Sequence, residues 1–179
     1  MPIAIHCPRT ELRQYAKTHG LVPARTAVLL IGAEPWEVSG LPETLQDFAR
    51  VEAIFFSGAD AREIVRLQSL TPPPPPTWFT KERARELAVF LREVRLADLN
   101  LVAACQYGER RSAGVTDVAR DYFDFDLKRS DGYPLDVIHR YVRALLREGE
   151  EALFKDEDGE EFGCGKMLDP SRRVTNFWG

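Results

Sequence analysis

The chain has 179 residues, a length that suits one domain with a complete hydrophobic core. Its formal net charge is −4, and it has no basic stretch interleaved with aromatic residues, which argues against nucleic-acid binding. Three cysteines do not make a disulfide framework, and no apolar run is long enough to span a bilayer. With no recognisable signal peptide, these features predict a protein of the reducing cytoplasm that has no membrane partner.

The first third of the chain predicts strands that alternate with helices or loops. Three short apolar segments bounded by turn residues predict buried strands, at residues 2–6, 26–31 and 51–56. The second of these segments is almost continuously apolar, which is typical of a parallel strand covered on both faces. Residues 9–18 predict a helix, and residues 34–42 predict a loop.

His6 and Cys7 close the first predicted strand and are candidates for a metal-binding or catalytic pair. No second pair of ligands follows at a usable spacing, so we expect no zinc site, and we interpret Cys7 as a small buried thiol.

The middle of the chain predicts two helices separated by a stiff segment. Residues 60–70 predict the first helix, and the proline run 72–76 predicts an extended, exposed loop. Thr80 is a suitable N-cap for a strong helix over residues 81–95. The apolar run 99–104 then predicts a fourth buried strand.

Two further helices follow this strand. Residues 113–123 have apolar positions at spacings of three and four, and Pro134 predicts the start of a last helix after a turn-rich segment, 124–132. The composition changes at residue 150, where an acidic tail begins. We therefore expect an α/β domain over residues 1–149 and a solvated tail over residues 150–179.

The alternation of strands and helices predicts a three-layer α/β fold, with a mostly parallel central sheet of four to five strands flanked by helices. In open sheets of this kind the functional site lies at the carboxyl ends of the strands.

Cys105 lies at such a strand end, directly before a loop that opens a helix. A helix N-terminus presents unpaired N–H groups and the positive end of the helix dipole, so it favours a bound anion. The same field lowers a cysteine pKa from about 8.5 to roughly 3.5–7.5. Gly108 permits the loop to turn its amides inward, Arg111 offers a planar fork to an oxyanion, and Ser112 can donate to the sulfur.

The spacing of Cys105, five residues, Arg111 and Ser112 resembles the signature loop of the cysteine-dependent phosphatases, the protein tyrosine and dual-specificity families. The layout of residues 1–148 is similar to that of their small bacterial and phage-type members, with a tyrosine-phosphatase-like fold. Segments 79–86 and 133–140 match loosely, and the loop is the only specific motif.

The resemblance implies a role for each loop residue. Cys105 would attack phosphorus and form a thiophosphate, and Arg111 would hold the oxygens as charge develops. Ser112 would ease departure of the thiolate. The substrate would be a phosphorylated protein or a small phosphate ester, with no metal or other cofactor. The remaining loop residues would contact the phosphoryl group: Gln106, Tyr107, Gly108, Glu109 and Arg110.

Two positions depart from the family pattern. The family has histidine directly before the cysteine, where this chain has Ala104. The family also needs an aspartate after the third strand to protonate the leaving oxygen, where this chain has Ser57 and Gly58; Asp60, about two residues further on, is the candidate acid. Glu109 would repel a dianion, and we expect it to pair with Arg110 on the surface.

Three alternatives remain open. The segment from Cys105 to Arg110 also resembles the Cys-x-x-Gly-x-Arg loop of rhodanese sulfurtransferases, in which cysteine carries a persulfide. A catalytically impaired phosphatase-like module that only binds phosphate is the second alternative. The third is a buried structural cysteine that ends a core strand.

Overall fold

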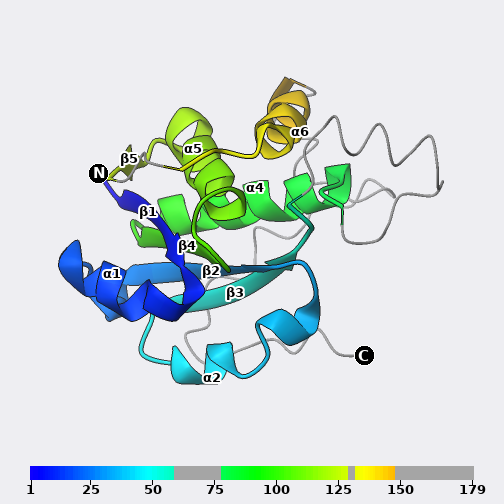
Figure 1. Cartoon of the computed structure of the whole chain (residues 1–179). Coiled ribbons are helices and arrows are strands. Elements are labelled where there is room, and N and C mark those ends of the chain that lie inside the picture. Colours follow the sequence, from blue (N-terminus) through cyan, green and yellow to red (C-terminus); the bar gives the residue numbers. More distant parts are fainter. Residues whose placement is uncertain (59–77, 129–131, 148–179) are drawn as a thin grey trace, which may run out of the picture.

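Five parallel strands form the centre of the molecule (Figure 1). The computed structural model describes residues 1–58, 78–128 and 132–147. Within these residues the sheet has the order β3-β2-β4-β1-β5. The strands are β1 (Ile3–Pro8), β2 (Thr26–Gly32), β3 (Arg50–Phe55), β4 (Asn100–Cys105) and β5 (Asp126–Leu127).

Helices cover both faces of this sheet. Figure 1 shows α4 (Lys81–Leu96), α5 (Arg111–Phe123) and α6 (Asp136–Arg147) over one face. The other face carries α1 (Leu12–Thr18) and the short α2 (Leu41–Thr44). Three 3-10 turns complete the described elements, at Arg9–Glu11, Pro23–Arg25 and Pro35–Glu37. The predicted three-layer α/β fold is therefore confirmed. Among the described helices, none combines the length and the apolar character that a membrane crossing requires.

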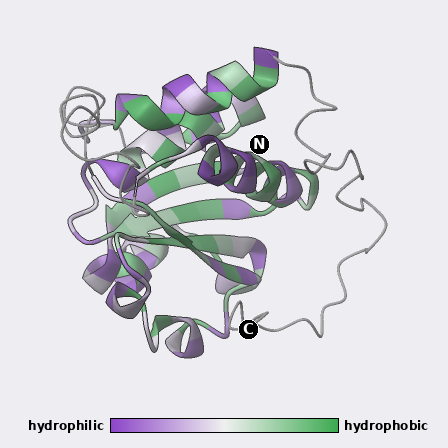
Figure 2. Cartoon of the chain, turned by 90° about the vertical axis from the view of Figure 1, so that its right-hand side faces the viewer, coloured by the Kyte–Doolittle hydropathy of each residue, from purple (hydrophilic) through white to green (hydrophobic). Residues whose placement is uncertain are grey.

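The side chains of β4 alternate between two hydrophobic clusters, one on each side of the sheet. Leu101 and Cys105 pack with the cluster under α4, α5 and α6, whereas Val102 and Ala104 pack with the cluster beside α1. Figure 2 shows a mostly hydrophobic sheet enclosed between helices that contain both hydrophobic and hydrophilic residues. Cys7 belongs to the second cluster, so it and Cys105 face opposite sides of the sheet although their strands are neighbours.

The predicted elements agree with the structure where local pattern decides them. Thr80 caps α4 as expected, because its side-chain oxygen accepts a hydrogen bond from the Arg83 N–H at 3.3 Å. The predicted loop 34–42 contains a 3-10 turn and the start of α2, and the turn-rich segment 124–132 contains β5. The last helix begins at Asp136 rather than at Pro134. The predicted helix 60–70, the proline run 72–76 and the tail 150–179 lie outside the described residues.

Two leucines of α4 test the assignment of its buried face. Leu91 is fully buried against the sheet, whereas Leu96, at the end of the same helix, is 72% exposed. We expect Leu91→Ala to lower the free energy of unfolding by about 2–5 kcal/mol, because it leaves a cavity in the core. Leu96→Ala is the matched control, with an expected change within about 0.5 kcal/mol. Urea denaturation of both variants measures the difference, and similar losses would contradict this packing.

Candidate active site

The candidate anion-binding loop, residues 105–112, joins β4 to α5. Cys105 is the last residue of β4 and Arg111 is the first residue of α5, so the predicted strand–loop–helix order is confirmed. In the parallel pairing of β1 with β4, Pro8 lies opposite Cys105. The loop therefore rises from the edge of the sheet where neighbouring parallel strands also end.

The sulfur of Cys105 accepts hydrogen bonds although it is buried. Its Sγ lies 3.2 Å from the Ser112 Oγ and 3.3 Å from the Gly108 backbone nitrogen, and the residue is 3% exposed. Burial raises the pKa of the thiol, but hydrogen bonds from the Ser112 side chain and backbone and from the Gly108 N–H, together with the charge of Arg111, outweigh it. The pKa of Cys105 is therefore lower than that of an ordinary cysteine.

Three consecutive carbonyl groups of the loop are held by donors outside it. His6 Nδ1 lies 2.6 Å from the Gly108 oxygen, the Tyr133 N–H donates to the Glu109 oxygen at 2.8 Å, and the Gly114 N–H donates to the Arg110 oxygen at 2.9 Å. In a trans peptide the N–H points away from its carbonyl. Each of these carbonyls shares its peptide unit with the N–H of the following residue. The N–H groups of residues 109, 110 and 111 are therefore directed to the opposite side of the backbone.

These amides are available to a ligand. The N–H groups of Glu109 and Arg110 donate to no acceptor in the part of the chain that the structure describes. No side chain caps the N-terminus of α5, where Arg110 is the N-cap residue. Unpaired N–H groups at a helix N-terminus form a site that favours an anion.

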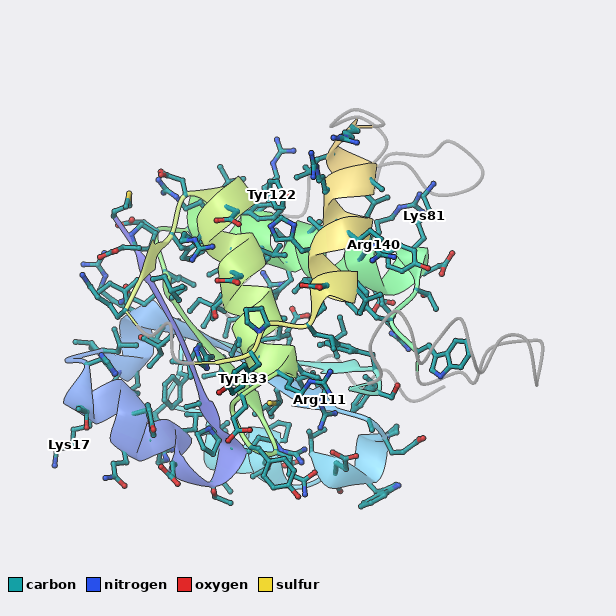
Figure 3. The ribbon with its side chains drawn as sticks, turned by 45° about the horizontal axis from the view of Figure 1, so that its top comes forward. Lys17, Lys81, Arg111, Tyr122, Tyr133 and Arg140 are labelled. Atoms are coloured by element: carbon teal, nitrogen blue, oxygen red, sulfur yellow. The ribbon has the colours of Figure 1, made fainter. Side chains whose placement is uncertain are left out.

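Arg111 lies beside the loop and is anchored by two other segments. Its Nη1 donates to the Phe56 carbonyl, which follows β3, at 3.3 Å, and its Nη2 lies 3.9 Å from Glu37 Oε2. The side chain is only 11% exposed. Figure 3 places Arg111 near the end of α5 where the helix begins, with Tyr133 at the same end. The guanidinium is thus close enough to Cys105 to lower the pKa of its thiol.

Glu37 connects this arginine to a second one. Arg9 donates from Nη2 to Glu37 Oε2 at 3.1 Å and from Nη1 to the Glu37 carbonyl at 2.8 Å. The backbone N–H of Ala33 donates to Glu37 Oε1 at 3.1 Å. The carboxylate is therefore fixed from several sides, and its negative charge stabilises two neighbouring guanidinium groups.

The predicted loop residues divide into two groups. Cys105, Gly108 and Ser112 are buried, and Arg111 is largely buried beside them. The other four side chains are exposed on the outer surface of the loop: Gln106, Tyr107, Glu109 and Arg110. Gln106 Nε2 donates to the Tyr107 hydroxyl at 3.2 Å. The expected pairing of Glu109 with Arg110 is wrong, since no ion pair joins these two described residues.

The candidate acid Asp60 lies outside the described residues. The end of β3 does border the site, because the Phe56 carbonyl accepts from Arg111. The next residue, Ser57, has a buried hydroxyl without a hydrogen-bond partner among the described residues. The segment expected to supply the acid thus leaves the sheet next to Arg111.

Sequence reasoning missed His6, Arg9 and Glu37 as parts of the site. The sequence singles out His6 only as part of a metal or catalytic pair with Cys7, and the described residues hold no cluster of His, Cys, Asp or Glu that could bind a metal ion. Their positions relative to the strands could have found them. His6 lies near the end of β1, Arg9 follows β1, and Glu37 follows β2, and both strands run parallel to β4, so they end at the same edge of the sheet.

A separate groove of about 570 Å³ lies between α5 and α6. Its lining includes Asp117, Asp121, His139 and Arg140, and it includes neither Cys105 nor Arg111. His139 Nε2 lies 2.9 Å from Asp121 Oδ2, and its Nδ1 lies 3.2 Å from the Tyr122 hydroxyl. These polar groups therefore satisfy one another.

Comparison with known protein-family models, curated proteins and solved structures found no match.

The pKa of Cys105 gives a prediction that needs no substrate. Only the thiolate reacts with iodoacetamide, so alkylation of Cys105 should rise with pH at a lower midpoint than for an ordinary cysteine. Ser112→Ala removes a donor to the thiolate and should raise the midpoint by about one to two pH units. Mass mapping of alkylated peptides across a pH series measures this. Ser39→Ala, at an exposed serine, is the control and should leave the midpoint unchanged.

Proposed function

We propose that this chain is a cysteine-dependent phosphatase that hydrolyses phosphotyrosine or another phosphomonoester through a thiophosphate intermediate. The observation that carries the proposal is the environment of Cys105 Sγ, which is bonded by Gly108 and Ser112 and lies next to Arg111. A thiolate, a set of inward amides and a guanidinium are the three components that a phosphoryl-transfer site of this kind requires.

The first step forms a covalent intermediate. The Cys105 thiolate attacks phosphorus, an S–P bond forms, and the P–O bond to the ester group breaks. The leaving oxygen takes the electron pair of that bond and a proton from a general acid. The amides of residues 109–111 and the Arg111 fork hold the three equatorial oxygens while their charge increases.

The second step regenerates the enzyme. Water attacks phosphorus and gives a proton to the group that acted as the general acid, the S–P bond breaks, and inorganic phosphate leaves with the oxygen of that water. The electron pair returns to sulfur, where hydrogen bonds from Ser112 and Gly108 stabilise the thiolate. The lowered pKa of Cys105 favours the thiolate, which makes this residue a better nucleophile and a better leaving group than an ordinary cysteine.

The position of the arginine favours phosphatase over sulfurtransferase chemistry. In the phosphatase-like spacing the functional arginine is Arg111, whose charge lowers the pKa of the Cys105 thiol. In the rhodanese-like spacing it would be Arg110, whose side chain is exposed and makes no ion pair among the described residues. The side chain of Arg111 is also largely buried rather than extended into solvent, which supports a functional cysteine rather than a structural one.

Replacement of the nucleophile tests the proposal. We expect Cys105→Ser to abolish hydrolysis of p-nitrophenyl phosphate, because a serine hydroxyl at this site is not ionised, while inorganic phosphate still binds to the amides. Cys7→Ala removes the other described thiol, which faces the opposite side of the sheet, and should retain activity. Steady-state hydrolysis and phosphate titration by calorimetry measure both properties.

The same preparations separate the alternatives. Thiosulfate:cyanide transfer by the intact protein without phosphate ester hydrolysis would replace the phosphatase proposal with a sulfurtransferase. Phosphate binding without either activity would assign a binding module instead. A protein that shows no turnover and binds no phosphate would indicate that Cys105 is a structural thiol.

The proposed general acid, Asp60, is tested by its pH dependence. If Asp60 protonates the leaving oxygen, Asp60→Asn should slow hydrolysis about 10²–10⁴-fold and flatten the decline of rate at high pH, since that decline reports loss of the acid's proton. The pH–rate profile measures both effects. Asp98→Asn is a matched control at an exposed ion pair with Arg25. An unchanged profile in the Asp60 variant would remove this residue from the mechanism.

A further inference from the structure

The anion-binding loop is held from the neighbouring strand by a buried imidazole. His6 lies on β1, is 1% exposed, and places Nδ1 2.6 Å from the Gly108 carbonyl oxygen. A carbonyl oxygen can only accept, so Nδ1 carries the proton and donates it. The histidine that donates this hydrogen bond is thus 102 residues away from Gly108 in the sequence.

Gly108 joins the imidazole to the sulfur. Its N–H donates to Cys105 Sγ at 3.3 Å, and its carbonyl accepts from His6. Holding that carbonyl outward directs the Glu109 N–H, in the same peptide unit, to the other side of the backbone. One histidine contact therefore fixes the peptide unit whose N–H, that of Glu109, is proposed to bind the phosphoryl oxygens, and it holds the residue whose own N–H donates to the sulfur.

Close packing leaves this arrangement little freedom to shift. Gly108 has a φ of +72°, and a Cβ at this position would lie 2.4 Å from the Cys7 carbonyl carbon and 2.4 Å from the Pro8 nitrogen. The loop backbone therefore rests directly on the end of β1. Gly132 packs closely against both the loop and the imidazole, because a Cβ at Gly132 would lie 2.7 Å from the Glu109 oxygen and 3.0 Å from His6 Cε1.

We propose that His6 is a positioning residue of the anion-binding loop: it orients the amide of residue 109 toward the bound oxyanion and holds in place Gly108, whose N–H donates to the thiolate. The inference rests on the proposed function, and it explains how the loop is held although Ala104, directly before the cysteine, has no side chain that can donate a hydrogen bond. His6 contacts neither substrate nor sulfur in this role; it acts through Gly108.

Two substitutions separate hydrogen bonding from packing. His6→Leu fills the space but removes the donor, so we expect the pKa of Cys105 to rise by about one unit and inorganic phosphate to bind about tenfold more weakly. His6→Asn can place an amide N–H near the position of Nδ1 and should recover most of both properties. The measurements are the pH profile of iodoacetamide alkylation at Cys105, mapped by peptide mass, and calorimetric titration with inorganic phosphate.

The controls identify what a failure means. His139→Leu removes a histidine of α6 that bonds Asp121 and Tyr122, and it should leave both readouts unchanged. A wild-type pKa and phosphate affinity in His6→Leu would overturn the inference. Equal impairment in the Leu and Asn variants would assign the effect to packing and would also overturn it. Alkylation needs no turnover, so an inactive wild-type protein would contradict the phosphatase proposal while leaving the role of His6 measurable.

Discussion

The site depends on the parallel direction of the strands. Because β1, β2, β3 and β4 all run the same way, their carboxyl ends meet at one edge of the sheet. Four different strands, or the segments after them, contribute to the surroundings of one loop. The contributing residues are His6, Glu37, Phe56 and Cys105. An antiparallel arrangement of the same segments would send half of these groups to the opposite end of the molecule.

Cys105 shows how a small number of donors reverses the effect of burial. A thiol enclosed among apolar side chains has a raised pKa and is unreactive. Here the apolar cluster under α5 reaches Cys105, yet Gly108 and Ser112 direct N–H and O–H groups at the sulfur, and the pKa falls. The lowered pKa of this buried thiol thus depends on the direction of a few polar bonds rather than on exposure.

Local pattern predicts much of this fold, and long-range pairing determines the rest. The segment around Cys105 could be predicted because an apolar strand, a glycine and a 3.6-residue periodicity are local properties of the sequence. Strand β5 could not, since Asp126–Leu127 has no strand pattern and forms only by pairing with β1. The contacts of His6 and Glu37 were missed for a similar reason: they follow from the order of strands in the sheet, which periodicity does not report.

The position of β1 has a consequence for the order in which the molecule can fold. Of the described strands this one is synthesised earliest, but it lies between β4 and β5, so its residues pair with Leu101 and Leu127, roughly a hundred residues later. Closing so large a loop is entropically costly and slows folding. During synthesis β1 therefore lacks both of its partner strands, and can pair wrongly, until β4 has left the ribosome.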